Sequence, residues 1–389
     1  MRSRFVISST ILVLIQSLSW MAHGGVALLR TPNSGIQPQT AVDTKGTIHL
    51  IYYTGSLEGG DVFYVKQPFG KTEFSKPLRV NGRPGSVIAM GTVRGAQMAL
   101  GRNGRVHVVW DGMGKGAARV SIGGKEVAPL LYTRLNDEQT AFEPERNIIT
   151  LAPGLDGGSS VAADSEGNVY VTWHAPQPGK SHEDEEDRAV FIARSREDGK
   201  TFETEKSAPS ERTGACACCG MRAFADSSGA VYILFRSAMG GLNRDALILV
   251  SRRHGEDFTI AHRDKWKVTT CPMSSATLTQ AKYGAIAAWE TDGQVYYAQV
   301  NPRTLAVSEP IRPPGETARK HPVAVSNGKG ETLLVWTEGT AWAKGGAIAW
   351  QVHSADGKPT SDKGRSEGLA SWSLATACAT PSGDFLVFY

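Results

Sequence analysis

One pattern recurs seven times along the 389 residues and constrains the fold more than any other feature. Each copy has a strand of small residues, a turn with a glycine, and an alternating strand that ends on an aromatic residue. The turns suit two-strand hairpins, because Asp and Asn tolerate turn conformations and glycine supplies positive φ. The closing aromatics recur at intervals of 47 to 63 residues: Tyr52, Trp110, Trp173, Phe235, Trp289, Trp336 and Tyr389.

A further β-rich segment follows every closing aromatic except the last, and a weaker fourth strand follows that segment. Four antiparallel strands repeated around an axis describe a β-propeller. We therefore predict an all-β propeller of four-stranded blades, with seven blades by repeat count and six as the alternative. The seventh copy ends after its second strand, at Tyr389, so a strand near residues 26–31 ("VALLRT") is expected to complete it and close the ring.

The first residues have the composition of an export signal. Arg2 and Arg4 precede an apolar stretch over residues 5–22, which is too short and too often interrupted by polar residues for a membrane anchor. We predict a cleaved signal peptide over residues 1–24 and a single propeller domain over residues 25–389. The mature protein would then be periplasmic or secreted, without stable membrane insertion.

Charge excludes one class of partner. The net charge of +4 is small for this length and gives no basic tract, so nucleic acid is not expected to bind. The densest charge run is acidic, over residues 182–187 ("HEDEED"), and it is interpreted as a solvated loop in preference to a cation site.

A resemblance to a known family can be stated on two short segments. The segment Ser195–Phe202 ("SREDGKTF") resembles the Asp-box turn of sialidase-like propellers, also called the BNR repeat, except that Glu197 stands at the usual Asp position. A more divergent copy spans Ser251–Phe258 ("SRRHGEDF"). In that family the box is structural and joins the third strand to the fourth. The resemblance implies a sialidase-like propeller over nearly the whole mature chain.

The same resemblance implies where a ligand would bind. In sialidases the working face lies at the start of each first strand and the end of each second strand, and propellers bind ligands at such a channel mouth. Alignment of the copies places Ser275 or Ala276 at this register in the fifth copy. The candidate ligand-binding residues are Gln39, Gln97, Asp111, His174, Arg222, Arg236, Glu290 and His321.

Sialidases hold the carboxylate of sialic acid with three arginines, because guanidinium groups pair bidentately with carboxylates. Where that family has its first arginine, this chain has Gln37 and Gln39. We therefore expect a propeller that binds a glycan or protein ligand without efficient sialidase turnover. The alternative is an exo-sialidase-type glycoside hydrolase with Arg222 and Arg236 as clamp residues, and no motif identifies its catalytic residues.

Four of the five cysteines fall before the first strands of copies four and five, and are therefore expected at one edge of the mouth. Cys216, Cys218, Cys219 and Cys271 also match an exported bacterial subgroup of sialidase-like proteins, which has a Cys-x-Cys-Cys segment and a later Cys-Pro. That subgroup commonly has His after Cys-Pro, where this chain has Met273.

Three interpretations of these cysteines stay open. Disulfides are favoured in an exported protein, for example between Cys271 and one of the other three. Thiolates with a Met thioether would suit copper as Cu(I), and four sulfurs would suit zinc, which gives a metal-binding protein as the second functional alternative. A redox-active disulfide is the third. No cofactor is certain. The fifth cysteine, Cys378, aligns with small residues of other copies and is predicted to be a buried free thiol.

Overall fold

The computed structural model describes residues 22–23, 25–180, 184–209 and 211–389. Most of the predicted signal peptide therefore lies outside the described residues, and its cleavage stays a prediction. Within the described ranges the regular structure consists of β-strands and four short 3-10 helices: η1 (Pro32–Ser34), η2 (Thr92–Arg94), η3 (Arg102–Gly104) and η4 (Glu185–Asp187). No helix in this part of the chain has the length and apolar character needed to cross a bilayer.

The strands form seven blades in the part of the chain that the structure describes, as the repeat count predicted. The first four blades are β3 (Ile36–Val42), β4 (Ile48–Ser56), β5 (Gly59–Gln67), β6 (Leu78–Arg79); β7 (Gln97–Leu100), β8 (Val106–Asp111), β11 (Leu130–Arg134), β12 (Arg146–Asn147); β13 (Ser160–Ala163), β14 (Val169–Pro176), β15 (Arg188–Ser195), β16 (Lys206–Ser207); and β17 (Arg222–Ala225), β18 (Val231–Arg236), β19 (Ala246–Ser251), β20 (Thr259–Asp264).

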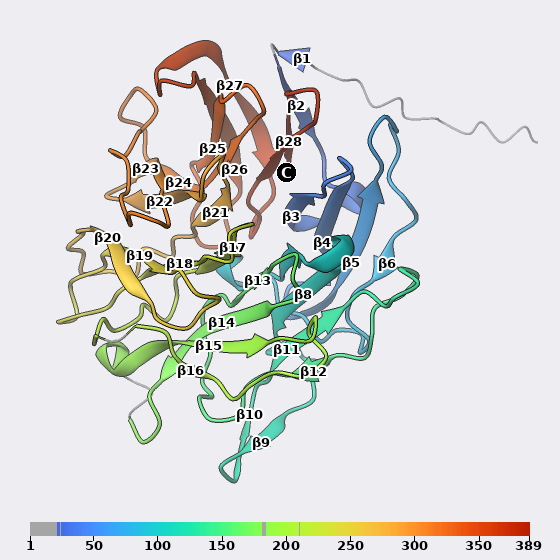
Figure 1. Cartoon of the computed structure of the whole chain (residues 1–389), viewed down its shortest axis with the longest axis vertical. Helices are drawn as coiled ribbons and strands as arrows, with labels where there is room; N and C mark the ends of the chain where they lie inside the picture. Colours follow the sequence, from blue (N-terminus) through green and yellow to red (C-terminus); the bar gives the residue numbers. More distant parts are fainter. Residues whose placement is uncertain (1–21, 24, 181–183, 210) are drawn as a thin grey trace, which may run out of the picture.

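The last three blades are β21 (Thr277–Gln280), β22 (Ala285–Thr291), β23 (Gln294–Val300); β24 (Arg319–Ser326), β25 (Thr332–Glu338), β26 (Gly346–His353), β27 (Pro359–Leu369); and β28 (Thr376–Ala379), β29 (Phe385–Phe388), β2 (Val26–Leu29), β1 (Ala22–His23). A separate hairpin joins β9 (Val120–Ile122) to β10 (Lys125–Val127). Figure 1 shows the blades around a central axis with the first strands innermost, and the first strands of successive blades contact one another around the whole ring.

The ring closes through the predicted N-terminal strand. Strand β2 pairs with β29, with Val26 opposite Phe385 and Leu29 opposite Phe388. This pairing is parallel, whereas the repeat pattern suggested antiparallel blades throughout. The reason is that β2 comes from the opposite end of the chain, so no hairpin fixes its direction.

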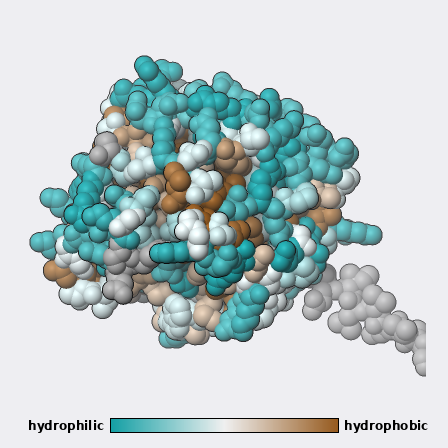
Figure 2. Space-filling view, turned by 90° about the horizontal axis from the view of Figure 1, so that it is seen from below, coloured by the Kyte–Doolittle hydropathy of each residue, from teal (hydrophilic) through white to brown (hydrophobic). Residues whose placement is uncertain are grey.

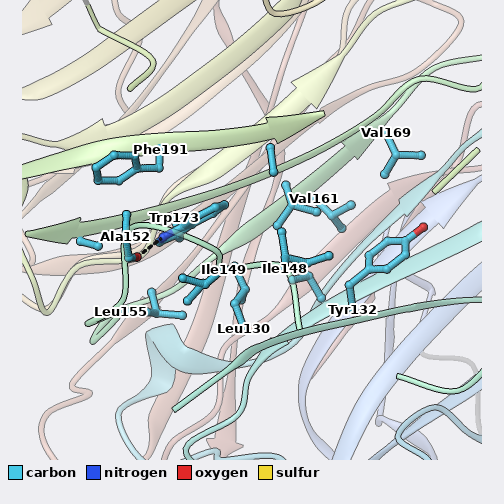
Figure 3. Close-up of a cluster of buried hydrophobic side chains, with 14 of the residues drawn as sticks. Leu130, Tyr132, Ile148, Ile149, Ala152, Leu155, Val161, Val169, Trp173 and Phe191 are labelled. Atoms are coloured by element: carbon cyan, nitrogen blue, oxygen red, sulfur yellow. Dashed lines mark hydrogen bonds between the residues drawn. The ribbon is translucent and has the colours of Figure 1, made fainter. Parts of the chain in front are cut away.

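An apolar core fills each junction between neighbouring blades. Figure 3 shows the core between blades 2 and 3, where Leu130 and Ile148 pack with Trp173 and Phe191. The indole N–H of Trp173 donates to the carbonyl of Ala152 at 3.0 Å, so the buried ring keeps its hydrogen bond. The face seen in Figure 2 is mostly hydrophilic, although apolar residues gather near the middle of the view. Stability therefore depends on neighbouring blades rather than on any blade alone.

The strand register confirms the repeat alignment with one correction. Gln39, Gln97 and Arg222 each pair with the residue before a closing aromatic, as the repeat alignment required. In the fifth blade that position belongs to Thr277, opposite Ala288, and not to Ser275 or Ala276. The missing residue of this copy lies after Gly284, between the turn glycine and the closing aromatic, so the first strand keeps its full length.

The segment Ser195–Phe202 lies at the end of the propeller opposite the mouth, in the turn between β15 and β16. The Ser195 hydroxyl accepts hydrogen bonds from the main-chain N–H of Gly199 at 2.9 Å and of Glu197 at 3.2 Å. Phe202 packs edge-on against Tyr132 of blade 2. The turn thus anchors blade 3 to blade 2 at the end of the propeller away from the mouth.

Candidate binding cleft at the propeller mouth

A cleft of about 280 Å³ opens at the mouth beside blades 5, 6 and 7. Blade 5 contributes the segment before β21, blade 6 the start of β24 and the loop after β25, and blade 7 the segment before β28. The lining residues are Cys271, Pro272, Met273, Lys320, His321, Thr340, Ala341, Trp342, Lys344, Trp372 and Ser373. Two predicted site residues, His321 and Met273, and one predicted cysteine, Cys271, therefore meet here.

Two tryptophans form one wall of the cleft. The rings of Trp342 and Trp372 meet edge to face, with centroids 4.5 Å apart and planes at 88°. Trp372 is buried, whereas Trp342 is 56% exposed, in a short hairpin where Ala341 and Lys344 exchange main-chain hydrogen bonds. A large aromatic side chain held open to solvent beside a cleft is a surface on which a ligand can stack.

The cleft lining is positively charged. Lys320 and Lys344 line it, and the lining includes no Asp or Glu. The Lys320 ammonium donates to the carbonyl of Pro272 at 2.6 Å, which fixes this charge at the cleft wall. The charge of Arg222 acts on His321 as well. The electrostatics of the cleft therefore favour an anionic ligand.

His321 is a buried residue of the cleft lining and stays neutral. Its Nδ1 is 3.0 Å from the Ser275 hydroxyl. Burial, reinforced by the charges of Lys320 and Arg222, lowers the pKa of His321 to about 3. A neutral imidazole here can donate or accept a hydrogen bond without adding charge.

Several cleft residues adopt backbone conformations that side chains disfavour. Met273, His321 and Trp372 have φ values of 46°, 52° and 63°, and Ala343 in the adjoining hairpin has 55°. Non-glycine residues at such angles cost about 1–3 kcal/mol each and cluster at functional sites. Asn33, Ser34 and Gln37, at the start of blade 1, have similar φ values, so such backbone conformations occur on the adjoining side of the mouth as well.

Arg236, one of the two arginines predicted to bind a ligand, instead holds neighbouring segments of the mouth together. Its guanidinium donates to the Ser274 hydroxyl at 3.0 Å and to the carbonyls of Arg244 and Glu290, and it lies over the ring of Trp266. Arg222 is also buried, and its guanidinium donates to the carbonyl of Met221 at 2.9 Å. Burial lowers the pKa of Arg222 to about 10. Neither arginine lines the cleft, so the two do not form a clamp there.

Two predicted carboxyl groups at the ends of second strands are buried rather than open to the cleft. Burial raises the pKa of Glu290 to about 7, although Lys320, 3.9 Å away, and Arg236 oppose the shift. Burial also raises the pKa of Asp111 well above its usual range, against the charge of Arg94. In the described part of the chain the Asp111 carboxyl oxygens make no hydrogen bond of ordinary geometry.

The remaining predicted residues lie elsewhere on the mouth. His174 is buried beside Arg188, whose Nη2 is 3.0 Å from its Nδ1. Burial lowers the pKa of His174 well below its usual range. Gln97 is buried and donates to the carbonyl of Gly95 at 3.2 Å, and Gln39 is half-buried. None of the three lines the cleft described above.

The four mouth cysteines meet as predicted, and a disulfide joins two of them. Cys218 of blade 4 is bonded to Cys271 of blade 5. Cys216 and Cys219 are free and buried, with their sulfurs 3.2 Å apart. Cys378 is a buried free thiol, also as predicted. Burial raises the pKa of Cys219, but the Cys216 thiol and the Arg236 charge outweigh it and lower the pKa overall.

Sequence reasoning missed the two tryptophans and the two lysines of the cleft. Trp342, Lys344 and Trp372 lie in loops between strands, and Lys320 lies in β24 one residue before the repeated segment, so none of the four belongs to the repeated pattern. A usable signal was nevertheless present: "TAWAKGG" over residues 340–346 places an aromatic and a cation in the loop after a second strand, at the working face.

No protein-family model matches this sequence, and no curated protein matches it either. Solved structures do resemble its fold. A protein of unknown function from Dyadobacter fermentans is 13% identical with a TM-score of 0.50, over 87% of this chain and 94% of that one. An alpha-L-arabinanase from Penicillium chrysogenum is 10% identical with a TM-score of 0.49, over 78% and 89%. A sialidase from Trypanosoma rangeli is 11% identical with a TM-score of 0.48, over 84% and 55%. At these identities the similarity concerns the fold alone.

Proposed function

We propose that the protein binds an acidic glycan in the cleft between Trp342 and the Cys271–Met273 segment, without efficient turnover. One observation carries this proposal: the cleft joins an exposed tryptophan to two lysines and has no carboxylate in its lining. We further propose, from the signal-like residues 1–24, that binding takes place in the periplasm or outside the cell.

The chemistry of a sugar acid matches this lining. The apolar face of a pyranose ring can stack on Trp342, while its carboxylate or sulfate pairs with Lys320 or Lys344. Neutral His321 and the Thr340 hydroxyl can serve the ring hydroxyls. A volume of about 280 Å³ lies just below the range of pockets for drug-sized ligands, which suits one terminal sugar. A protein partner would bury a far larger area.

Hydrolysis of the glycan is not supported by the same cleft. Glycoside hydrolysis usually needs two carboxyl groups at the scissile bond. Glu290 and Asp111 do not line the cleft, and Gln37 is bound to the carbonyls of Ala89 and Trp372 at 2.7 and 2.8 Å. We therefore expect no measurable turnover of a fluorogenic sialoside. Robust turnover that Glu290→Gln abolished would favour the hydrolase instead.

Glycan array screening followed by calorimetry tests the binding proposal. We expect uronate, sialate or sulfated sugars to bind and their neutral counterparts to bind at least ten-fold more weakly. Trp342→Ala should weaken binding ten-fold or more, and Lys344→Gln should reduce its salt dependence. The matched control is Tyr283→Ala, which removes a 73% exposed aromatic that also lies beside a lysine, outside the cleft. Equal loss in both aromatic variants, or no acidic ligand at all, would refute the proposal.

A further inference from the structure

The cysteine cluster joins two neighbouring blades at the mouth. Cys216, Cys218 and Cys219 lie in the loop before β17, and Cys271 lies before β21. All four sulfurs lie within 4.8 Å of one another. The Cys216 sulfur is 3.2 Å from that of Cys219 and 3.6 Å from that of Cys218. Such a set of four sulfurs exceeds what one disulfide needs.

These distances fit a single metal ion. A tetrahedral zinc site with zinc–sulfur bonds of about 2.3 Å places its sulfurs roughly 3.8 Å apart. The separations of 3.2 and 3.6 Å lie just below that value and no two of the four sulfurs are more than 4.8 Å apart, so small movements of the chain would bring them around one ion. The four cysteines differ in exposure: Cys216 and Cys219 are buried, whereas Cys271 is exposed. Exposed Cys271 gives an entry path for a reductant and for an ion.

The main chain around the sulfurs is fixed from several sides. The N–H of Cys216 donates to the carbonyl of Arg236 at 2.9 Å, and the N–H of Gly220 donates to the carbonyl of Ser274 at 2.9 Å. Glu185, from the acidic run, accepts from the N–H of Ala217 at 2.7 Å. Ordered supports of this kind hold metal ligands in place.

The outer shell supplies the groups that a thiolate site needs. The Ser274 hydroxyl lies 3.7 Å from the Cys219 sulfur and also accepts from Arg236. Four thiolates around a divalent ion leave a net charge of −2, and the guanidinium of Arg236 lies beside them to offset part of it. Hydrogen bonds to a ligating sulfur and nearby positive charge are typical second-shell features of metal sites.

We propose that the reduced cluster binds one thiophilic ion, Zn²⁺ or Cu(I), through Cys216, Cys218, Cys219 and Cys271. An external thiol reductant first cleaves the Cys218–Cys271 bond: two thiols are oxidised to one disulfide, and Cys218 and Cys271 each gain a hydrogen. Binding of Zn²⁺ then releases the protons of the thiols that become thiolate ligands. Thiolates are soft ligands, and a site made of them binds Zn²⁺ and Cu(I) in preference to Ca²⁺ and Mg²⁺. This inference goes beyond the proposed glycan binding and does not depend on it.

Metal retention by the whole mature protein tests the proposal. Protein reduced with a phosphine, desalted without oxygen and incubated with Zn²⁺ or Cu(I) should retain one ion per chain. Oxidised protein should retain none and should show three free thiols, at Cys216, Cys219 and Cys378. Cobalt in place of zinc should give thiolate-to-metal charge-transfer absorption. Failure of the reduced protein to retain either ion would overturn the proposal.

Variants identify the ligands and separate binding from misfolding. Cys216→Ser and Cys271→Ser should each lower ion affinity at least ten-fold, whereas Cys378→Ser, which changes a buried cysteine outside the cluster, should not. Ser274→Ala leaves every ligand in place and should lower affinity about ten-fold by removing a second-shell contact. Equal retention by Cys216→Ser, Cys271→Ser and the wild type, each with an unchanged circular dichroism spectrum, would refute the site.

Discussion

Asp198 and Glu290 are both buried carboxyl groups, but they lie at opposite ends of the propeller and differ in their neighbouring charged groups. Asp198, in the turn between β15 and β16, contacts Arg105 at 2.6 Å, Arg134 at 3.7 Å and His107 at 3.5 Å. Glu290, at the mouth, has one ammonium group at 3.9 Å, and its Oε2 makes no hydrogen bond within the described residues.

The two carboxyl groups show how the far end of the propeller differs from the mouth. Burial raises the pKa of Asp198, but the hydrogen bond and charge of His107 and the charge of Arg105 lower it overall, whereas burial dominates at Glu290 and raises its pKa. The far end therefore uses its carboxylate to tie blade 3 to blade 2. The mouth instead retains a poorly satisfied group, which costs stability and is typical of functional sites.

The largest change in the free energy of unfolding is expected when the charge of Asp198 is removed. Asp198→Asn should lower the free energy of unfolding by about 3–5 kcal/mol at pH 7, because it removes the anion that largely buried Arg105 contacts at 2.6 Å, whereas Arg134 keeps Glu143 at 2.7 Å. Asn keeps the φ of 58° accessible, so the loss reports charge rather than backbone strain. Urea unfolding measures it.

Acid should produce the same loss in the wild-type protein. Because the folded-state pKa of Asp198 is depressed, its contribution is present above the unfolded value of about 4 and is lost as the pH falls. The exposed pair of Glu203 with Arg196 supplies the control, and Glu203→Gln should change stability by less than about 0.5 kcal/mol. An equally small change in Asp198→Asn would remove the contrast with Glu290.

The mouth is expected to depend on a covalent link where the far end depends on charge. Cys271→Ser should lower stability by about 2–4 kcal/mol in oxidising buffer, because the disulfide closes a loop with a sequence separation of 53. In a reducing, metal-free buffer the variant and the wild type should unfold together. A variant that remained less stable than the wild type after reduction would show that packing, not the bond, matters there.

Substitution of Glu290 should change the free energy of unfolding in the opposite direction to substitution of Asp198. Its folded pKa of about 7 exceeds its ordinary value of 4.5, so the folded protein holds the proton more tightly and loses stability as the pH rises through that interval. Glu290→Gln should therefore stabilise the protein by up to about 3 kcal/mol at pH 8 and by almost nothing at pH 4. Thermal unfolding across this range measures the trend, with exposed Glu316→Gln as the control. A destabilised variant at pH 8 would mean that Lys320 is a true partner.

The sequence predicted the frame because the frame is repetitive. Each hairpin must bury the same face against its neighbours, so small residues, turn glycines and closing aromatics recur in step, and even the closing strand at Val26–Leu29 was predictable. The parallel direction of that strand was not, since no local pattern encodes it. The position of Thr277 was not predicted, because the fifth copy is one residue shorter than the others and the sequence does not show on which side of the turn glycine that residue is absent.

The cleft was predictable only in part. The cysteines were brought together correctly because they precede neighbouring first strands, but the choice of Cys218 as partner of Cys271 depends on loop conformation. Trp342 and Trp372 belong to loops that do not repeat, and they meet because blades 6 and 7 are neighbours in the ring. The burial of Glu290 and Arg236 likewise follows from packing that residue type alone does not reveal.

The smallest effect is expected at Asp111, which occupies the same place at the end of a second strand in blade 2 as Glu290 does in blade 5. Burial holds its pKa well above the usual range, so burial favours the neutral form of the carboxyl group. Asparagine has nearly the same shape and is also neutral. The difference in stability between Asp111→Asn and the wild type should therefore shrink as the pH falls, to within about 1 kcal/mol, while Asp198→Asn should show its full loss at pH 7. A loss in Asp111→Asn as large as that in Asp198→Asn would mean that Asp111 is an ionised, partnered carboxylate, and that the mouth is held by charge in the same way as the far end.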